Sequence, residues 1–148
     1  MGSVKKSGAP LVDARLDVKI KLSALWASVM FCYIYADYFG LYVPGALADM
    51  LKGNMKPLGP TTQGVLLGTS IMMAIPSVMI FASLALRPTL NRWLNIVFGT
   101  LFTLIILITM WGWAFYIFFG VIEIALTGLV VWYAWNWPTQ QTAVGPDE

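Results

Sequence analysis

Between Trp113 and Trp137 the chain runs for 25 residues with a single charged residue, Glu123, near the middle. About 20 consecutive apolar residues are enough for a helix to cross the hydrocarbon core of a bilayer. The stretch therefore predicts a membrane-spanning helix that carries one carboxyl group.

Charged residues also avoid three other long segments, as expected if the whole chain forms one membrane domain. Only 11% of the 148 residues are charged and 59% are hydrophobic, whereas soluble domains have about 25% charged residues. The sequence predicts an all-α fold, an antiparallel up-and-down bundle of four transmembrane helices with a short interfacial helix in the first outer loop. The expected helices cover residues of about 17–43, 63–86, 90–110 and 113–137 in a single domain, 1–148, with disordered tails at 1–11 and 139–148.

The residues that precede the first span leave two structures open. From Val12 to Leu22, apolar and polar residues alternate strictly, which is the period of a strand. Asp17 and Lys21 are also spaced as a favourable ion pair on one helical face. We favour a helix that extends the first span over an extended segment, which would need a partner strand.

The loop after the first span contains signals for a turn and a short helix. Pro44 and Gly45 should stop the first span, because proline cannot continue the backbone ladder and glycine tolerates the turn. The sequence ALADMLK, residues 46–52, places three large apolar side chains on one helical face and predicts the interfacial helix. Thr61 or Thr62 is expected to cap the second span.

The second span carries two signals for helix packing. Gly64 and Gly68 form a GxxxG pair, which allows another helix to approach closely. We favour a helix of the same chain as the partner, with a second copy as the alternative. Pro76 predicts a kink, because it removes one backbone hydrogen bond and clashes with the preceding turn.

The third and fourth spans must be joined by a tight hairpin. From Leu90 to Trp137 the chain is mainly apolar for 48 residues, and a single helix of that length would be about 72 Å long. The triplet Trp111-Gly112-Trp113 is the break that we expect. Thr89 is expected to cap the third span.

Basic residues near the ends of the spans indicate the orientation. Seven of the nine Lys and Arg residues lie in the N-terminal tail or in the turn 87–92, while Lys52 and Lys56 lie in the first outer loop. By the positive-inside rule, both termini are expected in the cytoplasm. The expected inner aromatic belt is Trp26, Trp93, Trp132, Trp135 and Trp137, and the outer belt is Tyr38, Tyr42, Trp111 and Trp113.

Glu123 is the strongest candidate for a functional polar group. It lies ten residues into the last span, about 15 Å deep, where a charged carboxylate is costly and suggests a proton relay, a cation site or a counter-ion. Tyr116, Gly120 and Thr127 share its helical face, which should point into the bundle. The alternative is a structural, protonated carboxyl group that is hydrogen-bonded to a tyrosine or a threonine.

Asp37 is a second candidate, nearer to the end of the first span. It lies about 7 Å deep, with Tyr33 one turn before it, and could line the mouth of an outward-facing pocket under the interfacial helix. We favour instead a carboxylate that reaches interfacial water. Asn91 and Asn95 are expected to form local hydrogen bonds near the inner surface. The candidate polar, ligand or proton site is therefore Glu123, Asp37, Tyr33, Tyr116 and Thr127.

The residue types that are missing argue against catalysis. The chain has no histidine and a single cysteine, Cys32, which excludes histidine ligands, His-assisted nucleophiles and a CxxC redox motif. It also lacks a glycine-rich phosphate loop and an acidic cluster for Mg²⁺. We expect no enzyme activity, no catalytic or metal-binding residues and no cofactor. The net charge of +2 is too small to suggest a nucleic-acid partner.

Five short motifs carry a resemblance to a known family. They are ADYFGLYVPG (36–45), MAIPSVM (73–79), NRWLNI (91–96), FFGVIE (118–123) and VWYAWNWP (131–138). Over residues of about 12–138 the chain resembles a bacterial family of small four-helix integral membrane proteins of unknown function, and in layout it resembles the DoxX-like proteins. The resemblance implies four spans in a bacterial inner membrane and no particular activity.

Two classes of function are open. The first is a binding, scaffold or accessory membrane protein, as a homo-oligomer, whose outer loop meets a protein, a small molecule or lipid. The second is a small proton- or cation-coupled transporter that uses Glu123. It resembles in plan the small multidrug exporters, which carry their glutamate on the first helix. A transporter needs a cavity that reaches Glu123, whereas a scaffold would seal that residue by packing.

Overall fold

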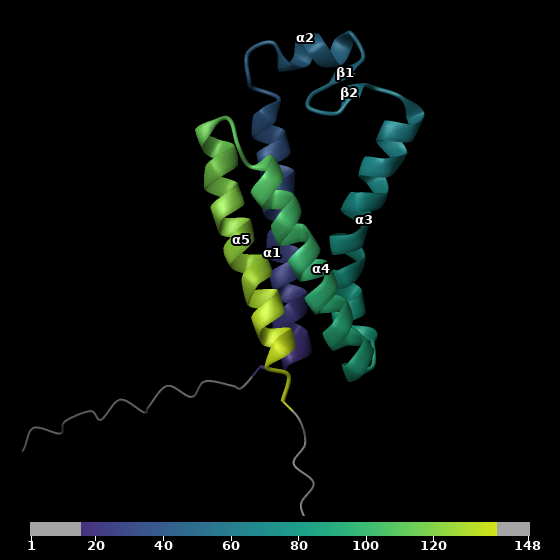
Figure 1. The fold of residues 1–148 in the computed structure, drawn as a ribbon, viewed down its shortest axis with the longest axis vertical. Coiled ribbons are helices and arrows are strands. Elements are labelled where there is room, and N and C mark those ends of the chain that lie inside the picture. Colours follow the sequence, from purple (N-terminus) through teal and green to yellow (C-terminus); the bar gives the residue numbers. More distant parts are fainter. Residues whose placement is uncertain (1–15, 139–148) are drawn as a thin grey trace, which may run out of the picture.

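The computed structural model describes residues 16–138, which form four long helices, one short helix and a two-stranded sheet (Figure 1). The elements in chain order are α1 (Val18–Gly40), α2 (Ala46–Leu51), β1 (Asn54–Met55), β2 (Gly59–Pro60), α3 (Gln63–Ala85), α4 (Pro88–Thr109) and α5 (Ala114–Trp135). The long helices run alternately up and down. This confirms the predicted all-α bundle of four helices with a short helix in the first loop. The tails expected to be disordered, 1–11 and 139–148, lie outside the described residues.

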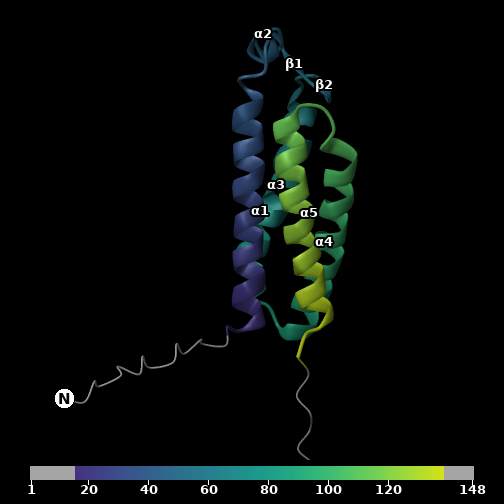
Figure 2. The same cartoon turned by 90° about the vertical axis from the view of Figure 1, so that its left-hand side faces the viewer.

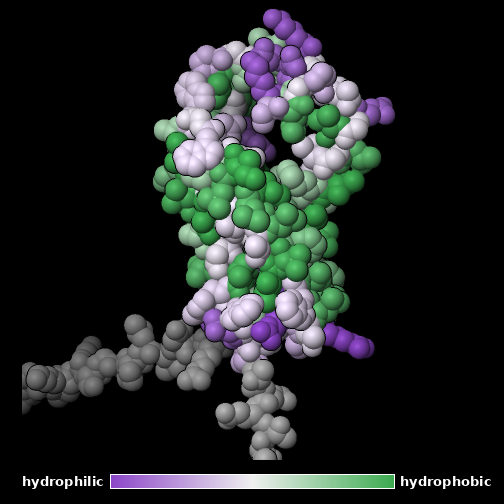
Figure 3. Space-filling model, in the orientation of Figure 1, coloured by the Kyte–Doolittle hydropathy of each residue, from purple (hydrophilic) through white to green (hydrophobic). Residues whose placement is uncertain are grey.

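Each of the four long helices is long and apolar enough to cross a membrane. Figure 3 shows a hydrophobic belt around the middle of the bundle and hydrophilic residues at its two ends. We call these the α2 end, which carries α2, β1 and β2, and the terminal end, where the described residues begin and end. The chain is a multi-pass membrane protein.

The first long helix begins within the segment of alternating residues. The Asp17 carboxylate accepts a hydrogen bond from the Lys19 backbone N–H at 2.7 Å and so caps α1. The segment is therefore helical from Val18 onward, as we favoured. Residues 12–15 lie outside the described residues.

The same helix ends at Gly40, three residues earlier than expected. The N–H groups of residues 41–43 bond to carbonyl groups three residues back, which tightens the chain into a turn before Pro44. α2 follows Gly45, whose φ of 85° suits glycine. The antiparallel pair β1–β2 was not predicted, because two-residue strands have too few residues to show a period.

The caps of the next two long helices differ in mechanism. The Thr62 hydroxyl accepts from the Val65 N–H at 3.2 Å, which confirms a threonine cap for α3. The predicted cap at Thr89 is wrong, because α4 begins one residue earlier, at Pro88. Proline suits a first helical position, since it needs no hydrogen-bond acceptor and its φ is already helical. The hairpin at residues 111–113 is confirmed, with Gly112 at φ 135°.

The hydrophobic core lies in the half of the bundle nearest the terminal end. α1 packs against α3 and α5, and α4 packs against α5, whereas α3 and α4 make few contacts (Figures 1 and 2). The central cluster is Leu22, Trp26, Met79, Phe102 and Val130. No residue of α3 before Met72 belongs to this cluster or packs against it. Figure 1 shows that half of α3 diverging from α4.

Because α3 diverges, its GxxxG pair has no partner helix in the described chain. A Cβ atom at Gly68 would meet no atom within 4 Å, and one at Gly64 would meet only the Thr62 hydroxyl, at 3.8 Å. Our interpretation of this pair as an intrachain packing site is therefore wrong. α3 continues as a helix through the buried Pro76, and the kink stays a prediction.

The close helix contacts form instead between α4 and α5. A Cβ at Gly99 of α4 would lie 2.8 Å from Val131 Cγ2, and one at Gly120 of α5 would lie 2.7 Å from Met110 Cβ. Only a residue without a side chain allows the two backbones to approach this closely. These two glycines, rather than Gly64 and Gly68, fix the helix spacing.

Two members of the expected inner aromatic belt contact the core, Trp26 within it and the half-buried Trp137 against it. Trp26 is fully buried in the core, because its indole N–H donates to the Asn95 side chain at 2.7 Å. Trp93, Trp132 and Trp135 are exposed near the terminal end. The exposed rings Tyr38, Tyr42, Trp111 and Trp113 lie toward the α2 end.

Candidate functional site

Glu123 lies on the buried face of α5, at the tenth of its 22 residues. Its side chain is 4% exposed, and Gly120 and Thr127, one turn away on either side, are also buried. Gly120 approaches Ile106 of α4, and Thr127 approaches Thr103 of α4. Glu123 lies between them on the same face and therefore points into the bundle, as the helical spacing predicts.

The Glu123 carboxyl group is not sealed by hydrogen bonds. Oε1 is buried and has no hydrogen-bond partner in the described chain. Thr127 does not supply one, because its hydroxyl donates to the Glu123 backbone carbonyl at 2.8 Å and accepts from Thr103 at 2.7 Å. The structural alternative, with a threonine or tyrosine bonded to this oxygen, is therefore not what the geometry gives.

Tyr33 of α1 faces the same interior region. Its ring packs edge-on against Phe102 of α4, with centroids 6.2 Å apart. Its hydroxyl oxygen is buried and, like Glu123 Oε1, has no partner among the residues described. The structure thus brings two candidate residues from distant helices to the same level of the bundle, since Tyr33 packs against Phe102 of α4 and the neighbours of Glu123 approach residues 103 and 106 of the same helix.

Asp37 lies one turn farther along α1, toward the α2 end. It is within electrostatic range of Glu123, Tyr33 and Tyr116, but its own side chain is exposed. The Tyr116 hydroxyl also abuts Gly40, where any side chain would collide with it. Asp37 and Tyr116 therefore lie between the α2 end and the buried carboxyl group.

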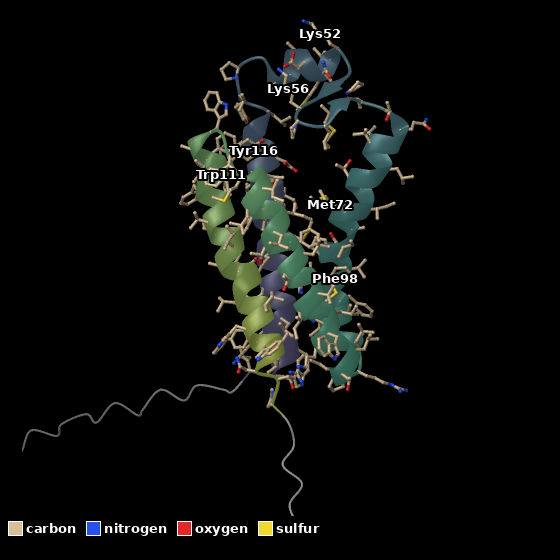
Figure 4. All side chains as sticks on the ribbon, in the orientation of Figure 1. Lys52, Lys56, Met72, Phe98, Trp111 and Tyr116 are labelled. Atoms are coloured by element: carbon tan, nitrogen blue, oxygen red, sulfur yellow. The ribbon has the colours of Figure 1, made fainter. Side chains whose placement is uncertain are left out.

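A pocket of about 240 Å³ opens beneath α2. Its lining residues are Val43, Pro44, Ala46, Asp49, Met50, Asn54, Lys56, Trp113 and Tyr116. Figure 3 shows the surface hollowed below the hydrophilic cap, and Figure 4 shows Lys56 under α2 with Tyr116 lower on α5. The pocket combines an apolar wall with a polar rim, which is the usual make-up of a small-molecule site.

The polar rim of this pocket contains the one ion pair found among residues 16–138. Lys56 Nζ lies 2.8 Å from Asp49 Oδ2, with the two side chains 78% and 34% exposed. Such an exposed pair contributes little stability. The pair matters for the pocket instead, because it places one positive and one negative group beside apolar lining residues.

A buried hydrogen-bond network at the terminal end extends farther than the sequence predicts. Asn95 accepts from Trp26 of α1 at 2.7 Å and donates to the Asn91 side chain at 2.7 Å, while Asn91 donates to the Ser83 carbonyl of α3 at 2.6 Å. All four side chains are buried. We expected Asn91 and Asn95 to bond only locally, but they join three helices.

Basic side chains close the helix ends beside this network. Lys19 Nζ donates to the Leu86 carbonyl at 2.7 Å, at the end of α3, and Arg92 donates to the Trp135 carbonyl at 3.3 Å, at the end of α5. Positive groups at helix C-termini also offset the negative end of the helix dipole. The terminal end thus carries basic side chains that join α1 to α3 and α4 to α5.

The candidate residues of these sites offer carboxylate and phenol oxygen atoms, which can bind cations or protons. No group of three or more His, Cys, Asp or Glu residues able to hold a metal ion occurs in residues 16–138. The candidate residues Glu123, Asp37, Tyr33 and Tyr116 are all acids, and the pocket beneath α2 lies on their approach from the α2 end. Thr127 belongs to the α4–α5 contact rather than to this group.

Comparison with known proteins gives one assignment. The chain matches none of the curated proteins and none of the solved structures. Residues 13–144 match a family of unknown function, DUF6326. This agrees with the resemblance to a small four-helix family of unknown function, and the match covers most of the chain. The protein belongs to the family DUF6326.

Proposed function

We propose that the protein is a non-enzymatic binding protein of the membrane, which captures a small molecule or a segment of a partner in the pocket beneath α2. The observation that supports this proposal most directly is the pocket itself, about 240 Å³ in volume and formed by two stretches of the chain, residues 43–56 and 113–116. Its walls come from the turn between α1 and α2, from α2 itself, from the β1–β2 hairpin and from the start of α5. Such convergence of polar and apolar groups favours a ligand with both characters.

The location that we propose is the bacterial inner membrane with both termini in the cytoplasm. The positive-inside rule supports this orientation, because the basic residues Lys19, Lys21 and Arg92 lie at the terminal end. The pocket beneath α2 then faces the periplasm. Its ligand would come from outside the cell.

An alkaline phosphatase fusion checks this orientation, because the enzyme is active only after export. We expect high phosphatase activity when it is inserted after Leu58, which is exposed between β1 and β2, and background activity when it is fused after Glu148. The reverse pattern would contradict the orientation.

Site-specific photocrosslinking in living cells tests the pocket. A photoreactive phenylalanine in place of Met50, which lines the pocket, should yield an adduct of one defined mass. Ala46 also lines the pocket, so Ala46→Trp should fill it and reduce the adduct at least about tenfold, as expected for a loss near 1.4 kcal/mol in binding.

Ala48 provides the matched control, because it lies on the same helix, is exposed and does not line the pocket. Ala48→Trp should leave the adduct at the wild-type level. An adduct that survives Ala46→Trp, or no adduct at all, would remove the basis for the proposal.

A transporter is the second candidate, and the unpartnered Oε1 of Glu123 favours it. Packing supports the first candidate more strongly, since Glu123 is 4% exposed and does not line the pocket beneath α2. Transport would require a movement that joins the pocket to this carboxyl group.

A further inference from the structure

Two buried oxygen atoms in the middle of the bundle lack a partner among the described residues. They are Glu123 Oε1 on α5 and Tyr33 Oη on α1. In native proteins, buried polar atoms are nearly always hydrogen-bonded, and buried charges are paired or bound to an ion. Two such atoms on packed helices, at the same level of the bundle, indicate that a bound species completes the site.

No side chain can supply the missing positive charge. The sequence has no Lys, Arg or His in residues 22–51, 57–86 or 93–148. The titratable groups that face Glu123 are Cys32, Tyr33 and Asp37 of α1, with Tyr116 of α5 farther along beside Asp37. α3 has no titratable residue, and the only one on α4, Arg92, caps α5 at the terminal end. Every nearby group is neutral or negative.

We propose that Glu123 and Tyr33 bind a single monovalent cation, with Asp37 at the approach to the site. One positive charge balances one buried carboxylate, and carboxylate and phenol oxygens suit a hard cation. The aromatic pair of Tyr33 and Phe102 equally suits a small organic ammonium ion. A divalent ion needs more anionic oxygen ligands than the residues described here bring together.

The arrangement of acids also provides an approach for the ion. Tyr116 lines the pocket beneath α2 and lies within electrostatic range of Asp37, which in turn lies within range of Glu123. Asp37 is exposed, so a cation can reach it without an opening of the core. A negative potential along this line concentrates cations next to the buried carboxylate.

Equilibrium binding to the full-length protein in lipid nanodiscs tests the site. The background salt is N-methyl-D-glucamine chloride at constant ionic strength, and the probes are Na⁺ and tetramethylammonium, added separately. We expect one of them to bind with a stoichiometry of one per chain. At a hundredfold excess over its dissociation constant it should raise the folding equilibrium constant about 100-fold.

Matched variants locate the binding. Glu123→Gln keeps the shape of the side chain and should abolish binding, while Tyr33→Phe removes one ligand oxygen and should weaken binding about tenfold. Asp17→Asn removes a carboxylate at the terminal end of α1, far from the proposed site, and should bind as the wild type does, because asparagine also caps a helix. Tyr33→Phe keeps the test decisive if Glu123→Gln does not fold.

Three outcomes would overturn the proposal. The first is that neither probe binds the wild type. The second is that Glu123→Gln and Tyr33→Phe both bind a probe as tightly as the wild type does. The third is an infrared carbonyl band of a protonated carboxyl group at neutral pH that Glu123→Gln removes and neither cation alters, which means that a proton neutralises Glu123. The pocket beneath α2 is tested separately by the Met50 adduct, so either proposal can fail alone.

Discussion

Replacement of Asn95 by leucine should destabilise the bundle by about 2–4 kcal/mol, because three hydrogen bonds between buried groups are lost together. Asn95 accepts from the Trp26 indole N–H at 2.7 Å and donates to the Asn91 carbonyl at 2.9 Å and to its side-chain oxygen at 2.7 Å. Leucine has a similar size, so the loss reflects unpaired polar atoms more than an empty space. The free energy of unfolding is measured by SDS titration in mixed micelles, followed by far-UV circular dichroism.

Asn136 offers a control at the same end of the bundle. It is exposed, and its side chain donates only to the Trp132 carbonyl of its own helix, at 3.0 Å. Asn136→Leu should change the unfolding free energy by less than about 0.5 kcal/mol, as surface substitutions usually do. Equal stability of the two variants would show that the network does not hold α1, α3 and α4 together.

Gly99→Val should have a similarly large effect on the contact between α4 and α5. Its Cβ would lie 2.8 Å from Val131 Cγ2 and 3.3 Å from Val130 Cγ1, and the branch of valine adds two more methyl groups. α4 must then move away, which also breaks the hydrogen bond between Thr103 and Thr127, 2.7 Å long. Overpacking and the lost bond together predict a cost of about 2–4 kcal/mol in the same unfolding assay.

Gly128→Val tests whether this cost comes from the contact or from the glycine itself. Gly128 lies in the middle of α5, and a Cβ there would meet no atom within 4 Å. The variant should therefore be as stable as the wild type, or slightly more stable because glycine is a poor helix former. If both valine variants unfold equally easily, the close approach at Gly99 is not what limits stability.

Local sequence patterns were sufficient to predict the five helices of this fold. Pro44 and the 111–113 triplet marked the ends of apolar segments, and the helical period placed Glu123 on an interior face. These features depend on residues only a few positions apart. The short sheet β1–β2 and the early end of α1 were missed, because both depend on backbone hydrogen bonds that leave no periodic signal.

Contacts between distant residues were the part that sequence reasoning could not supply. The bond between Trp26 and Asn95 joins residues 69 positions apart, and an aromatic residue near a helix end is as typical of a lipid interface as of a core. A glycine shows that close packing is possible but not which helix uses it, so Gly64 and Gly99 look alike in sequence. The one available signal was Asn91 and Asn95, two amides one turn apart on an apolar helix.

The arrangement of helix contacts also determines at which point of synthesis the bundle can close. Of the four long helices described, α5 leaves the ribosome after the other three, yet both α1 and α4 pack against it, while the neighbours α3 and α4 barely touch. Before its arrival, α1 has only α3 as a major partner, and α4 is held by few contacts with α3, by the asparagine network and by the packing of its Phe102 ring against α1. The arrival of α5 therefore converts a loosely associated set of inserted helices into a closed bundle, and quality control in the membrane meets an incomplete bundle until α5 has been inserted.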